Sequence, residues 1–498
     1  MALKPYLREV RESKAALIPL LLIIPAALIT GLVSAAGSNQ LTALWLAAAG
    51  GIALLALSTD MLIRAVVVLA LLVVGQAMYF LGLNQAVWFP FGLGLLLYLR
   101  VPMAYASGPY AKLRQSPPLT FWVLAFIAIV ILSMLANMTD LLQAFRAAKS
   151  YTFLWSIFFV IAYCGVKQHT LDQIWKFCIW MVFLQIPLVL YQYLVVAPKR
   201  GNLGGRFGVS WDAIVGGFGG DPMGGGASGT MAWFLVFMSV LCFALYRRQQ
   251  IGTWLLFSVL LASGVCVGLA EVKVVVVLLP LGMGALLIPY FRKHPFMVLL
   301  GLLTSAIVAL GVLMLYGYLR SKTGTVNYDI LEVLNDSFWY SLDPTYINYV
   351  TGEMGRVASL VHWWQENGFG DPLHTLIGHG PGSSSISGVF GAGEMARRYP
   401  FEINRSTLSI FLWDIGLTGV LCYILLITKG MQLAFVASKR VDITQFQAAA
   451  LEAIFGGLFM VLVMLPYGKD VSEVPALGVI LMLFLGYTSL IASALPKK

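Results

Sequence analysis

The chain has 498 residues, of which 59% are hydrophobic and only 11% are charged, and its formal net charge is +10. Soluble proteins carry about 25% charged residues, so this composition excludes a soluble globule. Apolar runs of about 18 or more residues recur along the chain, and they predict membrane-spanning helices rather than the short alternating strands of a barrel.

We expect an all-α polytopic membrane protein with about fourteen spans. The basic residues 1–14 precede an apolar run without a convincing cleavage site, which we interpret as a retained first helix. The fourth and sixth spans are short and could be half-helices. The expected spans cover residues 16–36, 41–58, 62–83, 86–99, 120–137, 151–166, 170–197, 229–246, 251–269, 272–291, 296–317, 405–428, 447–467 and 474–495.

The lysines and arginines cluster at the ends of these runs, so the net charge indicates membrane topology rather than nucleic-acid binding. Placing both termini in the cytoplasm puts most basic clusters on the cytoplasmic side. Three polar segments then lie outside: residues 138–150, the glycine-rich loop 198–228 and the long loop 318–404. We treat residues 1–498 as one integral membrane domain.

The long outer loop is too long for a structureless connector. Its stretch 355–364 has helical periodicity, and we expect short amphipathic helices packed on the membrane surface.

Arg206 and Lys273 lie on the expected outer side, where the positive-inside rule gives no reason for a basic residue. Arg206 lies among glycines, and Asp221 follows in Gly-Asp-Pro before a span. Glycines permit close backbone approach, and N–H groups at a helix start can hold an anion. The alternative is that the glycine-rich stretch around Arg206 is only a flexible linker outside the membrane. Lys273 follows Glu271 at a membrane edge, where an ionisable pair binds a ligand or merely snorkels.

A third group of cations lies in the long loop. Arg356, Arg397, Arg398 and Arg405 suggest a cationic surface suited to phosphate, unless they are only solvated helix ends. His379 lies between glycines and fits a turn better than a metal ligand. No metal-site spacing, phosphate-binding loop or serine-nucleophile motif occurs in the sequence, so we expect no metal and no cofactor.

Taken in chain order, the segments around Arg206, Lys273 and residues 356–405 resemble motifs of the O-antigen ligase/polymerase superfamily of bacterial cell-surface polysaccharide assembly. The resemblance covers roughly residues 200–430. The matching elements are Arg206 with Gly220-Asp221-Pro222, Lys273, Arg356 and Trp363 with Gly378-His379-Gly380-Pro381-Gly382, and Asn404-Arg405 leading to Gly416 and Gly419.

The resemblance implies a GT-C-like fold and metal-independent glycosyl transfer on the periplasmic side of the bacterial inner membrane. The donor would be an undecaprenyl-diphosphate-linked oligosaccharide, whose repeat units are polymerised into O-antigen, capsule or exopolysaccharide. Membrane lipids, a chain-length copolymerase and a flippase would be its partners.

By the same resemblance, Arg206, Lys273, Arg356 and Arg405 would bind the diphosphate. The alternative bases for the acceptor hydroxyl are Glu402, Asp221 and His379. Trp339, Trp363 and Trp364 could stack on sugar rings, unless they are only interfacial anchors.

The ligase branch has a histidine where this chain has Arg405, which favours a polymerase. One alternative is ligation onto lipid A–core or protein. The other is a non-catalytic flippase or transporter, which would predict charged residues inside the central spans, and these are scarce.

Overall fold

The computed structural model describes residues 57–106, 117–200, 214–220, 227–270, 272–288, 294–322, 339–350, 352–386 and 391–493. The chain divides into two compact units, residues 1–62 and 63–498. Only residues 57–62 of the first unit are described, so the architecture below is that of the second. The first two expected spans lie outside the described residues apart from residues 57 and 58.

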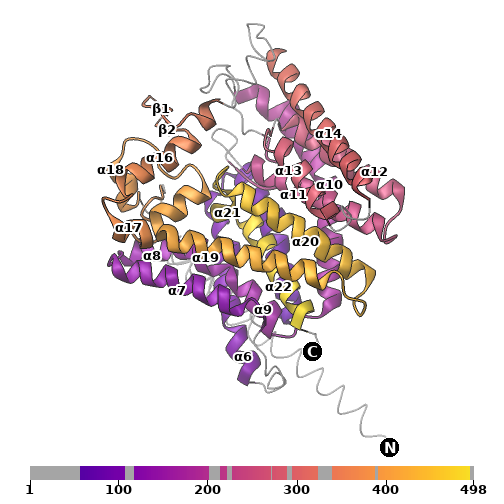
Figure 1. Ribbon diagram of the computed structural model, residues 1–498, viewed down its shortest axis with the longest axis horizontal. Helices are drawn as coiled ribbons and strands as arrows, with labels where there is room; N and C mark the ends of the chain where they lie inside the picture. Colours follow the sequence, from indigo (N-terminus) through magenta and orange to yellow (C-terminus); the bar gives the residue numbers. More distant parts are fainter. Residues whose placement is uncertain are drawn as a thin grey trace, which may run out of the picture. The chain divides into compact units, whose positions relative to one another are not determined.

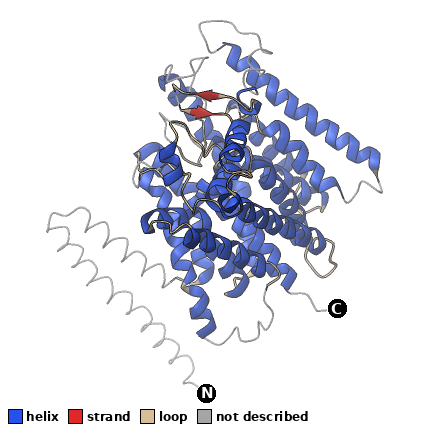
Figure 2. Cartoon of the chain, turned by 60° about the vertical axis from the view of Figure 1, so that its left-hand side comes forward, coloured by secondary structure: helices blue, strands red, loops and turns tan. Residues whose placement is uncertain are grey.

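The protein is an all-α membrane protein, and the residues that the structure describes include one two-stranded hairpin (Figures 1 and 2). In the described part, seven helical stretches are long and apolar enough to cross a membrane. They are Thr59–Leu81 (α3 Thr59–Val68, η1 Leu69–Val73, α4 Val74–Leu81), Gln85–Ala104 (within η2 Asn84–Val87, α5 Trp88–Tyr98, α6 Arg100–Ala106), Gln168–Val196 (α10 Gln168–Tyr191, η4 Gln192–Val196), α11 Ser228–Arg247, α19 Thr407–Ala437, α20 Gln445–Met464 and α22 Pro475–Ser493.

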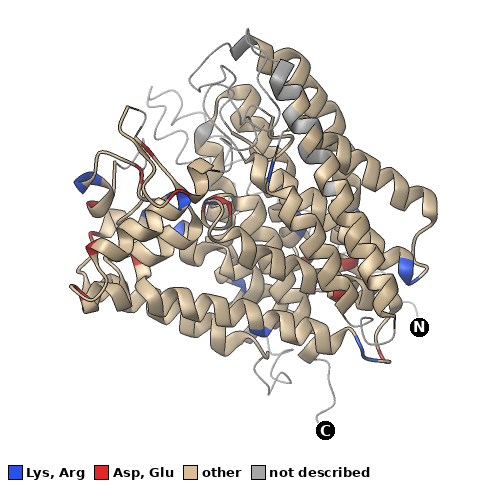
Figure 3. Cartoon of the chain, turned by 45° about the horizontal axis from the view of Figure 1, so that its top comes forward, with Lys and Arg blue, Asp and Glu red and all other residues tan. Residues whose placement is uncertain are grey.

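Shorter apolar helices accompany these seven, and the total of fourteen spans stays a prediction. They are α7 Thr120–Ala136, α12 Thr253–Leu269, α13 Val275–Leu287 and the first part of α14 Pro295–Lys322. The charged residues of the described part lie mainly at helix ends and in the connections, as the coloured ribbon of Figure 3 shows. This distribution is expected where helix middles face lipid or the apolar interior.

The core of the unit is built from helices that are apolar on all sides. Almost the whole of α11 and α22 is buried, and α20 packs against both α11 and α19. Aromatic rings fill the centre, where the centroids of Phe237 and Phe484 are 4.5 Å apart and Trp233 stacks on Phe237. A helix that is hydrophobic all round has to be enclosed by other helices or by lipid.

The expected outer segment 138–150 is mostly helical. Asp140 caps α8 Leu141–Ala148 by accepting the N–H groups of Leu142 and Gln143. α8 continues through a π-helical turn, η3 Lys149–Phe153, into α9 Trp155–Tyr163. The short sixth span is therefore extended at its N-terminal end, because the Asp140 cap starts the helix ten residues earlier than the apolar run.

The long loop between α14 and α19, which the sequence predicts on the outer side and which we call the outer loop, contains the expected short helices. α16 Arg356–Glu366 begins directly after Gly355, so the helix predicted for residues 355–364 is confirmed. It is followed by α17 Pro372–Ile377 and α18 Glu394–Arg398. Before it, β1 Ile347–Asn348 pairs antiparallel with β2 Glu353–Met354, in the register Ile347 opposite Met354. The remaining short elements are η5 Ala197–Arg200 and α21 Asp470–Glu473.

Helix α19 is interrupted at Gly416, whose φ of 65° and ψ of −171° are non-helical. This backbone conformation is essentially restricted to glycine. The end of α17 presses into the interruption, since a Cβ on Gly416 would lie 2.4 Å from the carbonyl of Leu376. A Cβ on Gly378 would lie 2.5 Å from the carbonyl carbon of Asp414. Two glycines thus let the outer loop and a membrane helix meet backbone to backbone.

Candidate functional site

The connection between α20 and α22, residues 467–473, is the point where the outer elements meet. The Tyr467 carbonyl accepts the Nε–H of Arg356 at the start of α16. The Gly468 carbonyl accepts both the N–H and the hydroxyl of Thr407 at the start of α19, at 2.8 and 3.0 Å. We call this stretch the 467–473 segment. It fixes the first turns of α16 and α19 relative to each other.

Arg356 is held at this segment by neutral groups. Its Nη1 donates to the Tyr340 hydroxyl at 3.1 Å and to the Ser341 hydroxyl. Its guanidinium lies 4.4 Å from the ring centroid of Tyr467 and 5.6 Å from that of Tyr340. Burial would lower the pKa of Arg356, but Tyr340 and Tyr467 raise it above the ordinary value. Within the described part no carboxylate lies within ion-pair distance of Arg356, so its positive charge is not neutralised by contact.

Lys273 approaches the same tyrosine. Its Nζ lies 5.9 Å from the ring centroid of Tyr340, so Lys273 and Arg356 both face that ring. The structure thereby brings together two of the four cations that the sequence suggested. Arg206 lies outside the described residues, as does Asp221.

Arg405 is close to this pair but is neutralised. It donates to Glu353 at 2.6 Å and to Glu402 at 2.9 Å. Lys469, which the sequence analysis missed, lies 3.5 Å from the same Glu402 oxygen. Burial would raise the pKa of Glu402, but Lys469 and Arg405 together hold it below its usual value. A carboxylate with two cationic partners is a weak base, so this geometry disfavours Glu402 as the base.

The start of α11 already faces an anion. The Thr230 hydroxyl donates to Asp470 at 3.0 Å, and a Cβ on Gly229 would lie 2.9 Å from the same carboxylate. The sequence suggested that N–H groups at this helix start would hold an anion. In the described residues that place is taken by the chain's own Asp470.

His379 lies elsewhere, beyond the far end of α16. Its Nε2 is 2.7 Å from the Asn367 side-chain oxygen, and its ring stacks on His374 with centroids 4.1 Å apart. Arg356 begins α16 and Asn367 follows its end, which corresponds to roughly 16 Å along the helix axis. Burial and His374 lower the pKa of His379 to about 4, so its imidazole is neutral at pH 7. The distance from Arg356 favours a structural role.

Trp363 does not offer a sugar-stacking face. It is only 3% exposed, because it is on the inner side of α16. The neighbouring Trp364 is 45% exposed and Trp339 is 60% exposed, and these rings could stack on a sugar. The sequence could not separate Trp363 from Trp364, since the side of α16 that is buried depends on what packs against it.

A buried carboxylate, also missed by the sequence analysis, anchors the glycine-rich turn after α17. Asp414 is fully buried and accepts hydrogen bonds from five donors. The donors are the Tyr151 hydroxyl, the Gly382 and Ser384 N–H groups, and the Ser383 and Ser384 hydroxyls. Arg146 of α8 adds hydrogen bonds to the Gly382 and Gly391 carbonyls. The turn is thus tied to α8, η3 and α19 together.

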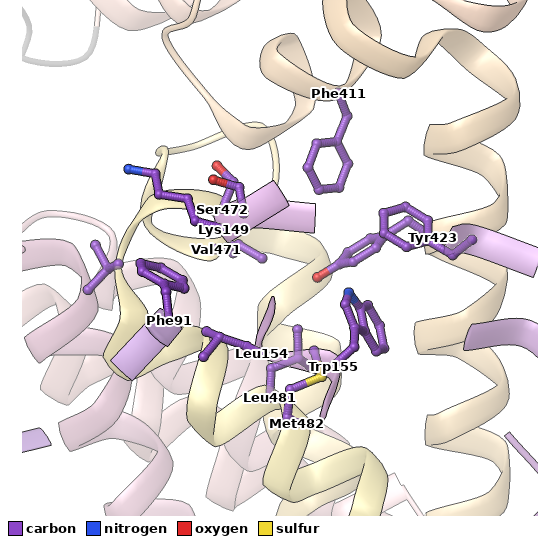
Figure 4. A pocket seen from close by; sticks show the side chains of 14 residues that line it. Phe91, Lys149, Leu154, Trp155, Phe411, Tyr423, Val471, Ser472, Leu481 and Met482 are labelled. Atoms are coloured by element: carbon purple, nitrogen blue, oxygen red, sulfur yellow. The ribbon is translucent and has the colours of Figure 1, made fainter. Parts of the chain in front are cut away.

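Two small adjoining cavities share Lys149, Ser150 and Ser472 in their linings, and Asp414 lines one of them. One is mainly apolar and is lined by Phe411, Tyr423 and Trp155, with Lys149 on its other side (Figure 4). The second has a volume of about 40 Å³ and a polar lining. The residues of the polar cavity are Arg146, Ala147, Lys149, Ser150, Tyr151, Ser385, Ile386, Ile410, Asp414, Ser472 and Glu473.

The sequence analysis missed Lys469 and Asp414, although the position of each in the sequence is unusual for a charged residue. Lys469 stands in a connection that the expected topology places outside, where the positive-inside rule gives no reason for a cation. Asp414 is an ionisable residue inside an apolar span, and such residues are usually functional or paired.

Comparison with known proteins adds no relative. No protein-family model matches the sequence, and no curated protein matches it significantly. Among the described residues, no group of three or more His, Cys, Asp or Glu side chains could hold a metal ion. The described geometry offers fixed cations at one end of a helical bundle, which can bind an anion and stabilise developing negative charge.

Proposed function

We propose that the protein transfers a glycan from a lipid-diphosphate donor at the outer face of a bacterial inner membrane. A lipid-linked repeat unit would be the acceptor, so the product is a surface polysaccharide. The proposal extends the resemblance to the O-antigen ligase/polymerase superfamily.

The proposal rests on the charge and the surroundings of the Arg356 side chain. A half-buried guanidinium held by two tyrosines, a serine and a carbonyl keeps its full positive charge and a defined orientation. A departing diphosphate gains negative charge as the sugar–phosphate bond breaks, and a pre-positioned cation stabilises that charge without reorganisation. Lys273 beside the same Tyr340 ring supplies a second positive charge.

Arg405 has a different part in this proposal. Its two ion pairs leave little free charge, so it holds the β1–β2 hairpin and Glu402 in place rather than binding phosphate alone. Asp414 does not support a transport role, because its oxygens are occupied by five donors from the chain.

The test compares Arg356→Ala with Arg398→Ala, whose guanidinium is 54% exposed and pairs with Glu394. Each variant is expressed in a strain lacking the wild-type chain, and polymer length and lipid-linked intermediates are measured. Arg356→Ala should abolish polymer and leave single repeats on the lipid carrier, whereas Arg398→Ala should behave as wild type. Polymer stranded on the carrier would indicate a ligase. Normal polymer with Arg356→Ala would overturn the proposal.

A further inference from the structure

The proposed transfer needs a base for the acceptor hydroxyl, and the described candidates from the sequence are poorly suited. Glu402 is bound by Arg405 and Lys469. His379 lies beyond the opposite end of α16 from Arg356. Asp414, which the sequence did not suggest as a base, is saturated by hydrogen bonds from its own chain.

Glu473 is a carboxylate of a different kind. It ends α21, one turn after Lys469, which corresponds to about 6 Å along the helix. Its side chain forms no hydrogen bond or ion pair with any residue that the structure describes. An unpaired carboxylate keeps its oxygens available for a proton.

The position of Glu473 is nevertheless fixed. The hydroxyl of the preceding Ser472 lies 3.4 Å from that of Thr407 and donates to the Lys469 carbonyl at 3.0 Å. Thr407 is two residues after Arg405 and also binds Gly468. The short helix that carries Glu473 is therefore pinned to the start of α19.

Glu473 lines the polar cavity together with Lys149, Ser150 and Ser385. Lys149 has no ion-pair partner among the described residues, and its Nζ lies 5.3 Å from the Trp88 ring centroid. The remaining ionisable groups of the lining are Arg146, Tyr151 and Asp414. Burial lowers the pKa of Lys149, and the nearby Glu473 carboxylate opposes that shift.

The cavity suits a hydroxyl group rather than a whole sugar. Its volume of about 40 Å³ corresponds to space for about three water molecules. A sugar could insert only one hydroxyl-bearing edge, with serine hydroxyls as hydrogen-bond partners and Glu473 as acceptor of the proton.

We propose that Glu473 is the base that deprotonates the acceptor sugar hydroxyl, and that this hydroxyl enters the cavity between Glu473 and Lys149. The inference rests on the proposed function and adds its base. In the step, the acceptor oxygen forms a bond to the anomeric carbon of the donor. The bond from that carbon to the phosphate oxygen breaks, the lipid diphosphate leaves with the electron pair, and the proton passes to Glu473.

The experiment uses the full-length protein in detergent and lipid-linked oligosaccharides extracted from membranes of a strain lacking the chain. Wild type, Arg356→Ala, Glu473→Gln, Glu473→Asp and Glu394→Gln are compared. Glu394 is the control because it is an exposed carboxylate on α18. Glu473→Gln should lower kcat by at least about 100-fold with little change in KM, and should remove the acid limb of the pH–rate profile. Glu473→Asp should keep part of the activity, and Glu394→Gln should keep all of it.

The outcomes separate the two proposals. A near-wild-type kcat for Glu473→Gln, with Arg356→Ala inactive, would overturn the role of Glu473 and leave the proposed function standing. No transfer by wild type would overturn both. If Glu473→Gln does not fold, an acid limb that is unchanged in Glu473→Asp would overturn the inference, and a shifted limb would support it.

Discussion

The carboxylate of Asp414 accepts the backbone N–H of Gly382 at 2.6 Å, which connects membrane helix α19 to the glycine-rich turn of the outer loop. The same oxygen also accepts the Tyr151 hydroxyl at 2.9 Å. One side chain therefore sets the distance between the loop, η3 and α19.

Replacing Asp414 should destabilise the protein strongly. Asp414→Ala leaves five buried donors without their acceptor, and a buried unsatisfied donor costs about 1–3 kcal/mol. We expect a loss of at least about 3 kcal/mol, and a smaller loss for Asp414→Asn, which keeps one acceptor oxygen. Thermal unfolding in detergent measures both, with the 58%-exposed Asp442→Asn as control. An Asp414→Ala protein as stable as this control would contradict the assignment.

The contact between Gly378 and Gly416 should tolerate no side chain. Both have positive φ, +71° and +65°, and a Cβ on either would collide with backbone atoms. Gly378→Ala and Gly416→Ala should each destabilise by about 2–4 kcal/mol. Gly264→Ala is the matched control, because nothing lies within 4 Å of its Cβ position in α12. The melting temperature of Gly264→Ala should be unchanged or slightly higher, and a similar drop in all three would argue against the close approach.

Acidification should loosen the turn around His379. Its pKa of about 4 in the folded protein lies below the ordinary value of about 6.5, so the unfolded chain binds more protons between these values. The stabilisation is therefore complete above about pH 6.5 and is lost as the pH falls toward 4. The melting temperature of His379→Gln should depend less on pH in this window than that of wild type. His294→Gln, at an exposed position, should keep the wild-type slope, and equal slopes in all three proteins would refute the prediction.

The Arg405–Glu353 pair should show measurable coupling in a double-mutant cycle. The Arg405 side chain is 17% exposed and is shared by two carboxylates. Arg405→Ala should therefore lower the free energy of unfolding by about 1–2 kcal/mol, which is more than the loss expected for Glu353→Gln. The Arg398–Glu394 pair, 54% and 56% exposed, serves as the comparison and should couple by less than about 0.5 kcal/mol. Equal coupling in both cycles would mean that burial adds nothing at Arg405.

The helix at residues 356–366 shows what a local sequence pattern can and cannot predict. Its periodicity was sufficient to predict α16, because side chains of one helix face recur every three to four residues. The same pattern could not tell which tryptophan is buried. It also could not indicate that Arg356 would bind Tyr467, since 111 residues separate the two.

Composition and periodicity alone determined that this chain is a helical membrane protein with a short helix near residues 355–364. Both properties follow from apolar run length and from local spacing, and neither needs a partner. Tertiary structure decided which charges are neutralised and which are not: Arg405 and Glu402 are paired, whereas Arg356 is held by neutral groups. It also brought the 467–473 segment to the starts of α16 and α19. Such contacts depend on how distant helices pack, and no local pattern encodes them.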